Sequence, residues 1–166
     1  MTNKRGIGFT RKMFVAIACL AISAFAAWAG SFDGRVVKVL DGDTIEVLLP
    51  EKTTVRVRLA GIDAPERGQP FSRMATQAVR DMAAEKTVRI ETQSKDWYGR
   101  TIGDVFLSDG RSLNRELVHL GLAWQYRRYS NDQELTALEA EARKARRGLW
   151  SEPDPTPPWQ RRREKR

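Results

Sequence analysis

The stretch that decides the fold is TVRVRLAGIDAPE at residues 54–66. Its first six residues alternate apolar side chains with Arg56 and Arg58, which is the period of a strand with one buried face. Strand geometry then projects both arginines away from the core. Asp63 follows a glycine-containing turn, and Pro65 favours extended backbone in the residue before it. The stretch therefore predicts a strand that brings charged side chains to one end of a sheet.

Similar short runs of Val, Ile and Leu elsewhere predict a β-rich domain that also contains helices. The predicted strands are Arg35–Leu40, Thr44–Leu49, Thr54–Leu59, Thr87–Thr92 and Thr101–Leu107. Apolar residues at helical spacing predict helices at Phe71–Ala84, at Ser112–Leu120 and from about Asn131, where Ser130 and Gln133 have capping-box spacing. This order is typical of an α+β, mainly β fold: a five-stranded Greek-key barrel of the OB type with three packed helices, spanning residues 30–150.

Residues 1–29 have the pattern of a cleavable signal peptide. Four basic residues precede an apolar run from Met13 to Ala27, and Ala27-Trp28-Ala29 offers an A-x-A cleavage site. The sequence therefore predicts export, either to a periplasm or out of the cell. The alternative is an uncleaved anchor, which would be the protein's one association with a membrane.

The basic composition says little about partners. The chain carries a formal net charge of +8, but four of its basic residues lie in the first 29 residues, and five more lie in residues 161–166 with a single acid. The part between is close to neutral, so the high pI is a weak argument for binding nucleic acid. Residues 151–166, with four prolines before the basic run, are expected to form a disordered tail.

Histidine is nearly absent, and this limits the chemistry. His119 is the one histidine, and it stands on a helix that otherwise has a packing pattern. Two-histidine ribonuclease sites, HNH-type sites and His/Cys zinc sites are therefore excluded. A hydrolytic site here has to consist of carboxylates, arginines and a hard metal ion held by oxygen.

Two short segments supply such groups near one barrel end. They are DGDT at residues 41–44 and RLAGIDAPE at residues 58–66. Alone, the first is also a plain Asx turn, the second a loop opening, and Arg58 one of many solvated strand arginines. An EF-hand is excluded, because apolar residues follow where its loop needs oxygen ligands. The conjunction of the two segments carries the argument.

Together with Asp96-Trp97-Tyr98-Gly99-Arg100, these segments resemble, in order and spacing, the motifs of the thermonuclease (micrococcal or staphylococcal nuclease-like) family. LNRELV at residues 113–118 and GLA at residues 121–123 add to the resemblance, which covers nearly all of residues 30–150. It implies a calcium-dependent endonuclease that hydrolyses phosphodiester bonds of DNA and RNA with little sequence preference and leaves 3′-phosphate ends.

The resemblance also implies a role for each matching residue. Asp43 and Asp63 would ligate Ca²⁺ through their carboxylates, and Ala64 through its backbone carbonyl. Glu66 would be the base for the attacking water. The phosphate ligands implied are Arg58 and Arg100, and planar bidentate guanidinium groups suit that task. Tyr98 and Tyr129 are the implied substrate contacts, and for Tyr98 barrel packing is an equal alternative.

The sequence departs from the family pattern in two places. At Tyr126-Arg127-Arg128-Tyr129 one of two expected tyrosines falls on Arg127, and Tyr126 could replace it by a one-residue shift. The loop after Glu66 is several residues shorter than in the family, which affects how Glu66 is held.

Two other classes of function remain open at this stage. One is a nuclease-like module that binds nucleic acid without cutting it, which would lack the catalytic acids. The other is a plain OB-fold single-strand binder, which calls for an aromatic, basic groove. The complete set of acids and arginines favours the enzyme. No stable protein partner is implied, and the chain is expected to be a monomer.

Overall fold

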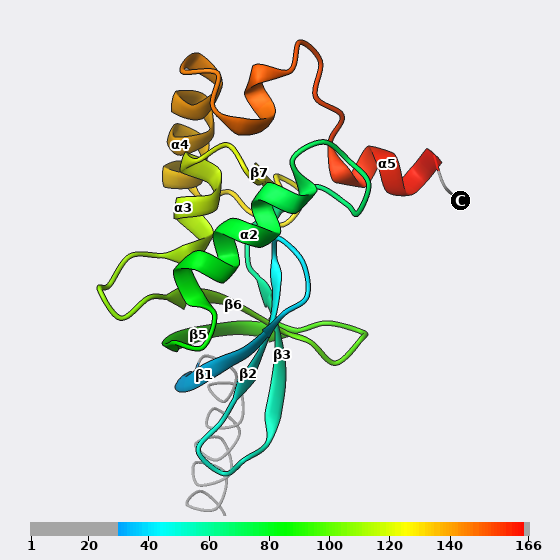
Figure 1. Ribbon diagram of the computed structural model, residues 1–166. Coiled ribbons are helices and arrows are strands. Elements are labelled where there is room, and N and C mark those ends of the chain that lie inside the picture. Colours follow the sequence, from blue (N-terminus) through cyan, green and yellow to red (C-terminus); the bar gives the residue numbers. More distant parts are fainter. Residues whose placement is uncertain (1–29, 165–166) are drawn as a thin grey trace, which may run out of the picture.

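The computed structural model describes residues 30–164, so the predicted signal peptide lies outside the described residues. Five strands form a closed barrel in the order β1-β2-β3-β6-β5, in which only the β3–β6 pair is parallel. They are β1 Ser31–Val39, β2 Thr44–Leu48, β3 Thr54–Leu59, β5 Thr87–Lys95 and β6 Thr101–Phe106. The predicted five-stranded barrel of the OB type is confirmed, and Figure 1 shows its strands below the helices.

The first strand closes the barrel because it belongs to two pairs. Its first half, from Ser31, pairs with β5, and its second half, from Arg35, pairs with β2. A register shift lies between Val36 and Lys38, and such a bulge bends a strand. Gly34 stands where the two pairings meet, at a place where a Cβ would collide with Val47.

Three helices lie on the barrel as expected, and a fourth follows them. They are α2 Ser72–Ala83, α3 Leu113–His119, α4 Gln133–Lys144 and α5 Pro158–Glu164, with a 3-10 helix at Gly148–Ser151. The main core joins the barrel interior to the inner faces of the first three, including Ile45, Val57, Ala75, Ile90 and Leu117, all at most 1% exposed. Within residues 30–164, no helix is long and apolar enough to cross a membrane.

A small second sheet was missed from the sequence. β4 (Ile62–Asp63) pairs with β7 (Trp124–Gln125) antiparallel, and Asp63 stands opposite Trp124. Each strand has two residues, which is too short for any periodicity to reveal. The pair matters for the site because it fixes the backbone of Asp63.

The start of α4 differs from the capping box expected at Ser130 and Gln133. Asp132 is the N-cap, and its Oδ1 accepts from the backbone N–H groups of Glu134 (2.8 Å) and Leu135 (3.2 Å). Ser130 Oγ instead accepts from Asp132 N at 3.3 Å. A carboxylate is as good a cap as a hydroxyl and also complements the helix dipole, so the helix begins two residues later.

The segment after residue 151 differs from the disordered tail that the composition predicted. It packs on the domain: Pro158 is buried, and Trp159 contacts Trp124 with ring centroids 5.8 Å apart. Residues 158–164 form α5, which lies beside the loop before α2 in Figure 1. The disordered tail was predicted from the prolines and charges of this segment. A composition argument does not register one tryptophan, Trp159, that packs on the domain.

Candidate active site

Asp43 ends the turn between β1 and β2. Its backbone N–H donates to Asp41 Oδ1 at 3.1 Å, the Asx contact typical of this turn. A Cβ on Gly42 would lie 2.7 Å from Ala75 Cβ and 2.8 Å from Ala64 Cβ, so the turn passes α2 too closely for any other residue. This close passage lets Asp43 Oδ2 accept from Ala64 N at 2.7 Å.

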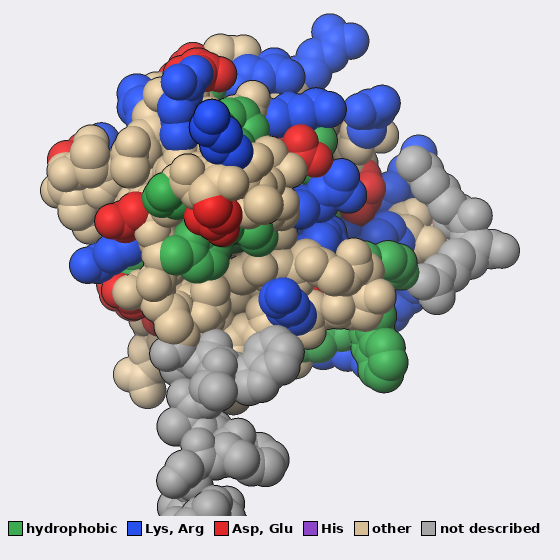
Figure 2. Space-filling model, turned by 90° about the horizontal axis from the view of Figure 1, so that it is seen from below, with side chains coloured by type: hydrophobic (Ala, Val, Ile, Leu, Met, Phe, Trp, Pro, Cys, Tyr) green, Lys and Arg blue, Asp and Glu red, His purple; other side chains and the backbone are tan. Residues whose placement is uncertain are grey.

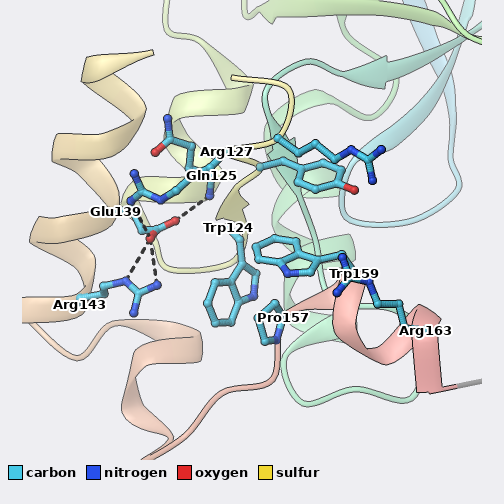
Figure 3. A pocket seen from close by; sticks show the side chains of 10 residues that line it. Trp124, Gln125, Arg127, Glu139, Arg143, Pro157, Trp159 and Arg163 are labelled. Atoms are coloured by element: carbon cyan, nitrogen blue, oxygen red, sulfur yellow. Dashed lines mark hydrogen bonds and ion pairs between the residues drawn. The ribbon is translucent and has the colours of Figure 1, made fainter. Parts of the chain in front are cut away.

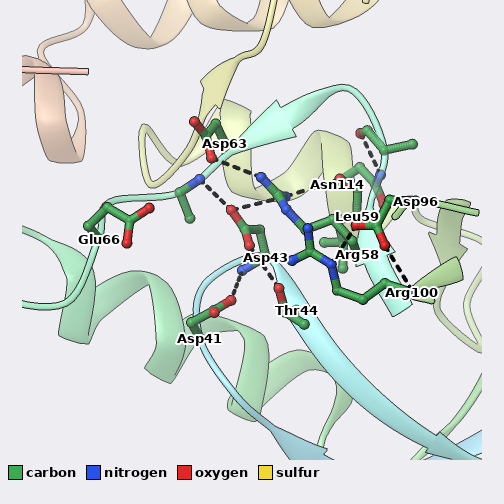
Figure 4. A network of polar contacts seen from close by, with 12 residues as sticks. Asp41, Asp43, Thr44, Arg58, Leu59, Asp63, Glu66, Asp96, Arg100 and Asn114 are labelled. Atoms are coloured by element: carbon green, nitrogen blue, oxygen red, sulfur yellow. Dashed lines mark hydrogen bonds and ion pairs between the residues drawn. The ribbon is translucent and has the colours of Figure 1, made fainter. Parts of the chain in front are cut away.

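Asp63 enters the same cluster from β4. Its side chain is 1% exposed, and its neighbour Ala64 provides the backbone N–H that binds Asp43. The segment from the end of β3 through β4 thus passes beside the β1–β2 turn, as Figure 4 shows. Two carboxylates that are 20 residues apart in sequence are brought together in this way.

Arg58 bridges the two aspartates. Its Nη1 lies 3.0 Å from Asp43 Oδ2, its Nη2 lies 2.8 Å from Asp63 Oδ1, and its side chain is only 13% exposed. Nη1 also donates to the carbonyl of Leu59 at 3.3 Å. The strand alternation predicted that Arg58 leaves the core, and the barrel end directs it onto buried carboxylates.

Glu66 lies at the open side of the cluster, where its side chain is 37% exposed. Its carboxylate binds Arg162 of α5, with Oε1 2.5 Å from Nη1. The same guanidinium reaches Asp63, with Nη2 2.6 Å from Oδ2 and Nη1 3.3 Å from Oδ1. Arg162 was not foreseen as a site residue, because it lies in a segment expected to be disordered.

Because Asp43 and Asp63 are buried, their carboxylates need positive charge nearby to stay ionised. Burial raises the pKa of Asp43, and the nearby Arg58 guanidinium opposes that rise. Burial likewise raises the pKa of Asp63, opposed first by the hydrogen bond from Arg162 and then by the charge of Arg58. Carboxylates removed from water stay ionised only beside positive charge. The barrel end is therefore a site for positive charge, supplied here by two guanidinium groups.

Arg100 approaches from the turn between β5 and β6. The parallel pairing of Val57 with Thr101 brings it beside β3, and Figure 4 draws it on the side of Arg58 away from Glu66. Its Nε donates to Asp96 Oδ2 at 2.7 Å. Burial acts to raise the pKa of Asp96, but hydrogen bonds from the side chain and backbone of Arg100 outweigh it and lower that pKa. Asp96 therefore orients Arg100.

Tyr98 and Trp97 are exposed rather than packed in the barrel. Tyr98 is 84% exposed, and Arg100 Cζ lies 5.5 Å from the centroid of its ring. Tyr129 is also exposed, and its ring meets that of Tyr126 edge to face at 4.9 Å. Of the two readings for Tyr98, the structure favours an aromatic surface that is open to a ligand.

Asn114 holds the cluster's framework and had no role assigned from the sequence. It is fully buried, its Nδ2 donates to the carbonyl of Ala60 (2.9 Å), and its Oδ1 accepts from Val105 N (3.0 Å). It thereby ties the segment after β3 to β6 and α3. A lone amide on the apolar face of a helix was the available signal.

His119 lies apart from this cluster, near the C-terminal end of α3, where Arg147 Nη1 is 3.2 Å from its Nδ1.

The donor atoms suit a hard divalent cation, although residues 30–164 contain no preformed group of three or more metal-binding side chains. Asp43, Asp63 and Glu66 supply only oxygen, with neither thiolate nor imidazole among them. Oxygen donors of this kind are what Ca²⁺ prefers. Arg58 and Arg162 neutralise these carboxylates, so a cation would have to compete with the two arginines for the same oxygens.

The charged residues elsewhere are mixed. Lys and Arg side chains lie on the face seen in Figure 2 with Asp and Glu among them, and the last turn of α5 adds three arginines.

Comparison with known proteins identifies the family. Residues 56–152 match the model of the staphylococcal nuclease homologue family. A micrococcal nuclease of Shigella flexneri is 42% identical over 159 residues, which cover 90% of each chain. An uncharacterized endonuclease of Escherichia coli is 45% identical over 140 residues, 84% of this chain and 91% of its own length. One from Haemophilus influenzae is 37% identical over 132 residues, 80% of this chain and 74% of its own. This chain belongs to the staphylococcal nuclease family.

Proposed function

We propose that this nuclease-family protein is a calcium-dependent phosphodiesterase that cuts DNA and RNA internally, with little sequence preference, and leaves 3′-phosphate ends. One observation carries the proposal: two buried aspartates, a more exposed glutamate and Arg58 meet at one barrel end, with Arg100 beside them. A pure binding module has no need for buried carboxylates that cost stability to ionise. The names of the relatives agree with a nuclease.

Each residue has a distinct task in this proposal. Asp43, Asp63 and the carbonyl of Ala64 would hold Ca²⁺, which when bound neutralises phosphate charge and supplies an oriented water. Arg58 and Arg100 bind the oxygens of the scissile phosphate, because a guanidinium is planar, permanently charged and bidentate. Fixed donors of this kind act where charge develops in the transition state.

Glu66 is the general base. It is the least buried of the three acids, which leaves it accessible to a water molecule. In the proposed step, Glu66 takes a proton from water as the water oxygen bonds to phosphorus. The P–O5′ bond breaks, the 5′ oxygen leaves as a hydroxyl with a proton from solvent, and the phosphate stays on the 3′ oxygen.

Weak base selectivity follows from the kinds of contact that are present. Arginine contacts to phosphate carry no sequence information, and stacking on an exposed ring accepts every base. Tyr98 and Tyr129 are the proposed aromatic contacts. We also propose that the protein is exported through residues 1–29, as a monomer whose partners are its nucleic-acid substrates.

The test is digestion of single-stranded DNA and RNA by the purified protein with Ca²⁺, with Mg²⁺ and with a chelator, followed by end-group analysis. Glu66→Gln should lower the calcium-dependent rate by about 10²- to 10⁴-fold, because the general base is lost. Glu51→Gln, in the exposed β2–β3 turn, is the matched control and should cut at the wild-type rate. Binding of both polymers without cutting under every condition would favour the non-catalytic module instead.

A further inference from the structure

The C-terminal strap, residues 152–164, contacts the domain in and beside the site at three points. Its Thr156 carbonyl accepts from Gln69 Nε2 at 3.0 Å, and Gln69 Oε1 accepts from the backbone N–H of Glu66 at 2.8 Å. Further on, the indole of Trp159 stacks on Tyr126, with centroids 5.2 Å apart and planes 2° from parallel. Arg162 is the third point. The strap is thus connected both to the loop of Glu66 and to the aromatic residues after β7.

The contacts of Arg162 engage both oxygens of the most buried acid. Nη2 takes Asp63 Oδ2, and Nη1 reaches Asp63 Oδ1, which also accepts from Arg58. The other bond of Nη1 joins Glu66 Oε1. A divalent cation at Asp63 needs those same lone pairs, and it would meet the positive charge of Arg162 at short range. The two cations therefore exclude each other.

Trp159 covers a second part of the same face. Figure 3 shows Trp159 extending from α5 toward Trp124, at a cavity of about 400 Å³ that is also lined by Tyr126, Arg127 and Arg163. Trp159 stacks on the face of Tyr126, the tyrosine that could replace the one missing at Arg127. The strap therefore covers the ring of Tyr126 as well as the carboxylates of Asp63 and Glu66.

The packing of the strap is suited to reversible docking. α5 has seven residues, too few for a stable helix on its own. Arg162 and its partner Glu66 are 39% and 37% exposed, so water and salt reach that ion pair. A competing ligand can therefore displace the strap.

We propose that the strap is an autoinhibitory element: Arg162 occupies Asp63 and Glu66 in place of the divalent cation, and Trp159 covers Tyr126, until metal and nucleic acid displace them. Because the strap is tethered to the domain, its local concentration is of millimolar order. It lowers the apparent metal affinity by the fraction of molecules in which the site is open. Once released, the neighbouring arginines of α5 are free to contact the phosphates of the incoming polymer.

The test compares Arg162→Gln with Arg161→Gln in the full chain. Both remove one charge from the same helix, but among residues 30–164 the side chain of Arg161 pairs with Glu164 alone, at 3.4 Å. Isothermal titration calorimetry with Ca²⁺ alone should give a dissociation constant about tenfold lower for R162Q than for R161Q, because the competitor is gone. Trypsin should cleave the wild-type strap faster with Ca²⁺ than with chelator.

Equal or weaker calcium binding by R162Q would overturn the proposal, as would a rate of strap cleavage that calcium leaves unchanged. Arg162→Lys serves as a second variant: it keeps the charge but loses the fork that spans two carboxylates, and its affinity should fall between the other two.

The proposal rests on the metal site of the proposed function, but the two fail differently. If R162Q binds calcium more tightly and neither variant cuts nucleic acid, the strap stands and the enzyme does not. If calcium-dependent cutting is present but its half-maximal calcium concentration is the same in R162Q and R161Q, the enzyme stands and the strap is overturned.

Discussion

Two arginines hold Asp63, and they reach it in different ways. Arg58 comes from five residues earlier on a barrel strand and is 13% exposed, whereas Arg162 comes from 99 residues later on a short helix and is 39% exposed. The distances to Asp63 are almost the same, at 2.8 Å and 2.6 Å. Proximity alone therefore does not separate a built-in partner from a removable one. The difference lies in what holds each arginine in place.

The surroundings of the two side chains explain this. β3 is hydrogen-bonded on both sides, to β2 and to β6, so Arg58 moves only if the barrel opens. Arg162 depends on the packing of Pro158 and Trp159 and on one glutamine contact. The strand partner is expected to matter for stability and for chemistry, and the helix partner for access to the site.

Removing Arg58 should have the largest effect. Arg58→Ala leaves Asp43 with no guanidinium partner and should lower the free energy of unfolding by about 3 kcal/mol. It should also lower the cutting rate by about 10²- to 10³-fold, because a donor to the scissile phosphate is lost. Arg162→Ala should cost under about 1 kcal/mol, since Asp63 keeps Arg58. Urea unfolding of both variants measures the contrast, and equal losses would contradict it.

The stability lost in Arg58→Ala should also depend on pH. Burial already holds the pKa of Asp43 above its unfolded value, and removing Arg58 raises it further. The native variant therefore takes up protons that the unfolded chain does not, so the loss is complete above the raised pKa and shrinks as the pH falls below it. Unfolding at about pH 8 and about pH 5 should show a smaller deficit at the lower pH.

Trp159→Ala should have an intermediate effect. Loss of the stack on Tyr126 weakens the strap while Arg162 itself is unchanged, so the calcium dissociation constant should fall by a few-fold, about half of the R162Q effect on a logarithmic scale. Trp97→Ala removes a fully exposed indole and is the matched control for calorimetry. If both variants bind calcium like the wild type, the tryptophan is not what holds the strap.

Salt should have the smallest effect, and it should act on only one arginine. At about 0.5 M salt the Debye length is well under 10 Å, so the partly exposed Arg162–Glu66 pair is screened more than the buried Arg58 pairs. Trypsin cleavage within α5 should therefore rise with sodium chloride, while far-ultraviolet circular dichroism stays constant. A strap that salt leaves equally protected would indicate that apolar packing holds it alone.

The barrel and much of the site could be predicted from the sequence because their signals are local. Alternation in residues 54–59 placed Arg58 outside the core, and the Asp-Gly-Asp turn and the Asp-Ala-Pro-Glu segment marked the acids that the structure brings together. The two-residue strands β4 and β7 and the amide of Asn114 carry almost no local signal, since their value lies in contacts between distant segments. The N-cap at Asp132 was missed because Ser130, two residues earlier, is also a residue type that caps helices.

The sequence by itself determined which groups are available: oxygen ligands, arginines, and neither a second histidine nor, after residue 29, a thiol. Residue type and strand period are properties of neighbouring residues, so they can be read along the chain. Only the tertiary structure decided that Arg162 binds Asp63 and Glu66. That contact depends on the packing of Trp159 against Trp124 and Tyr126. It also depends on Gln69, whose hydrogen bonds join the strap to the loop of Glu66. Such pairings are fixed by burial and charge across the folded domain, where residues about a hundred positions apart become neighbours.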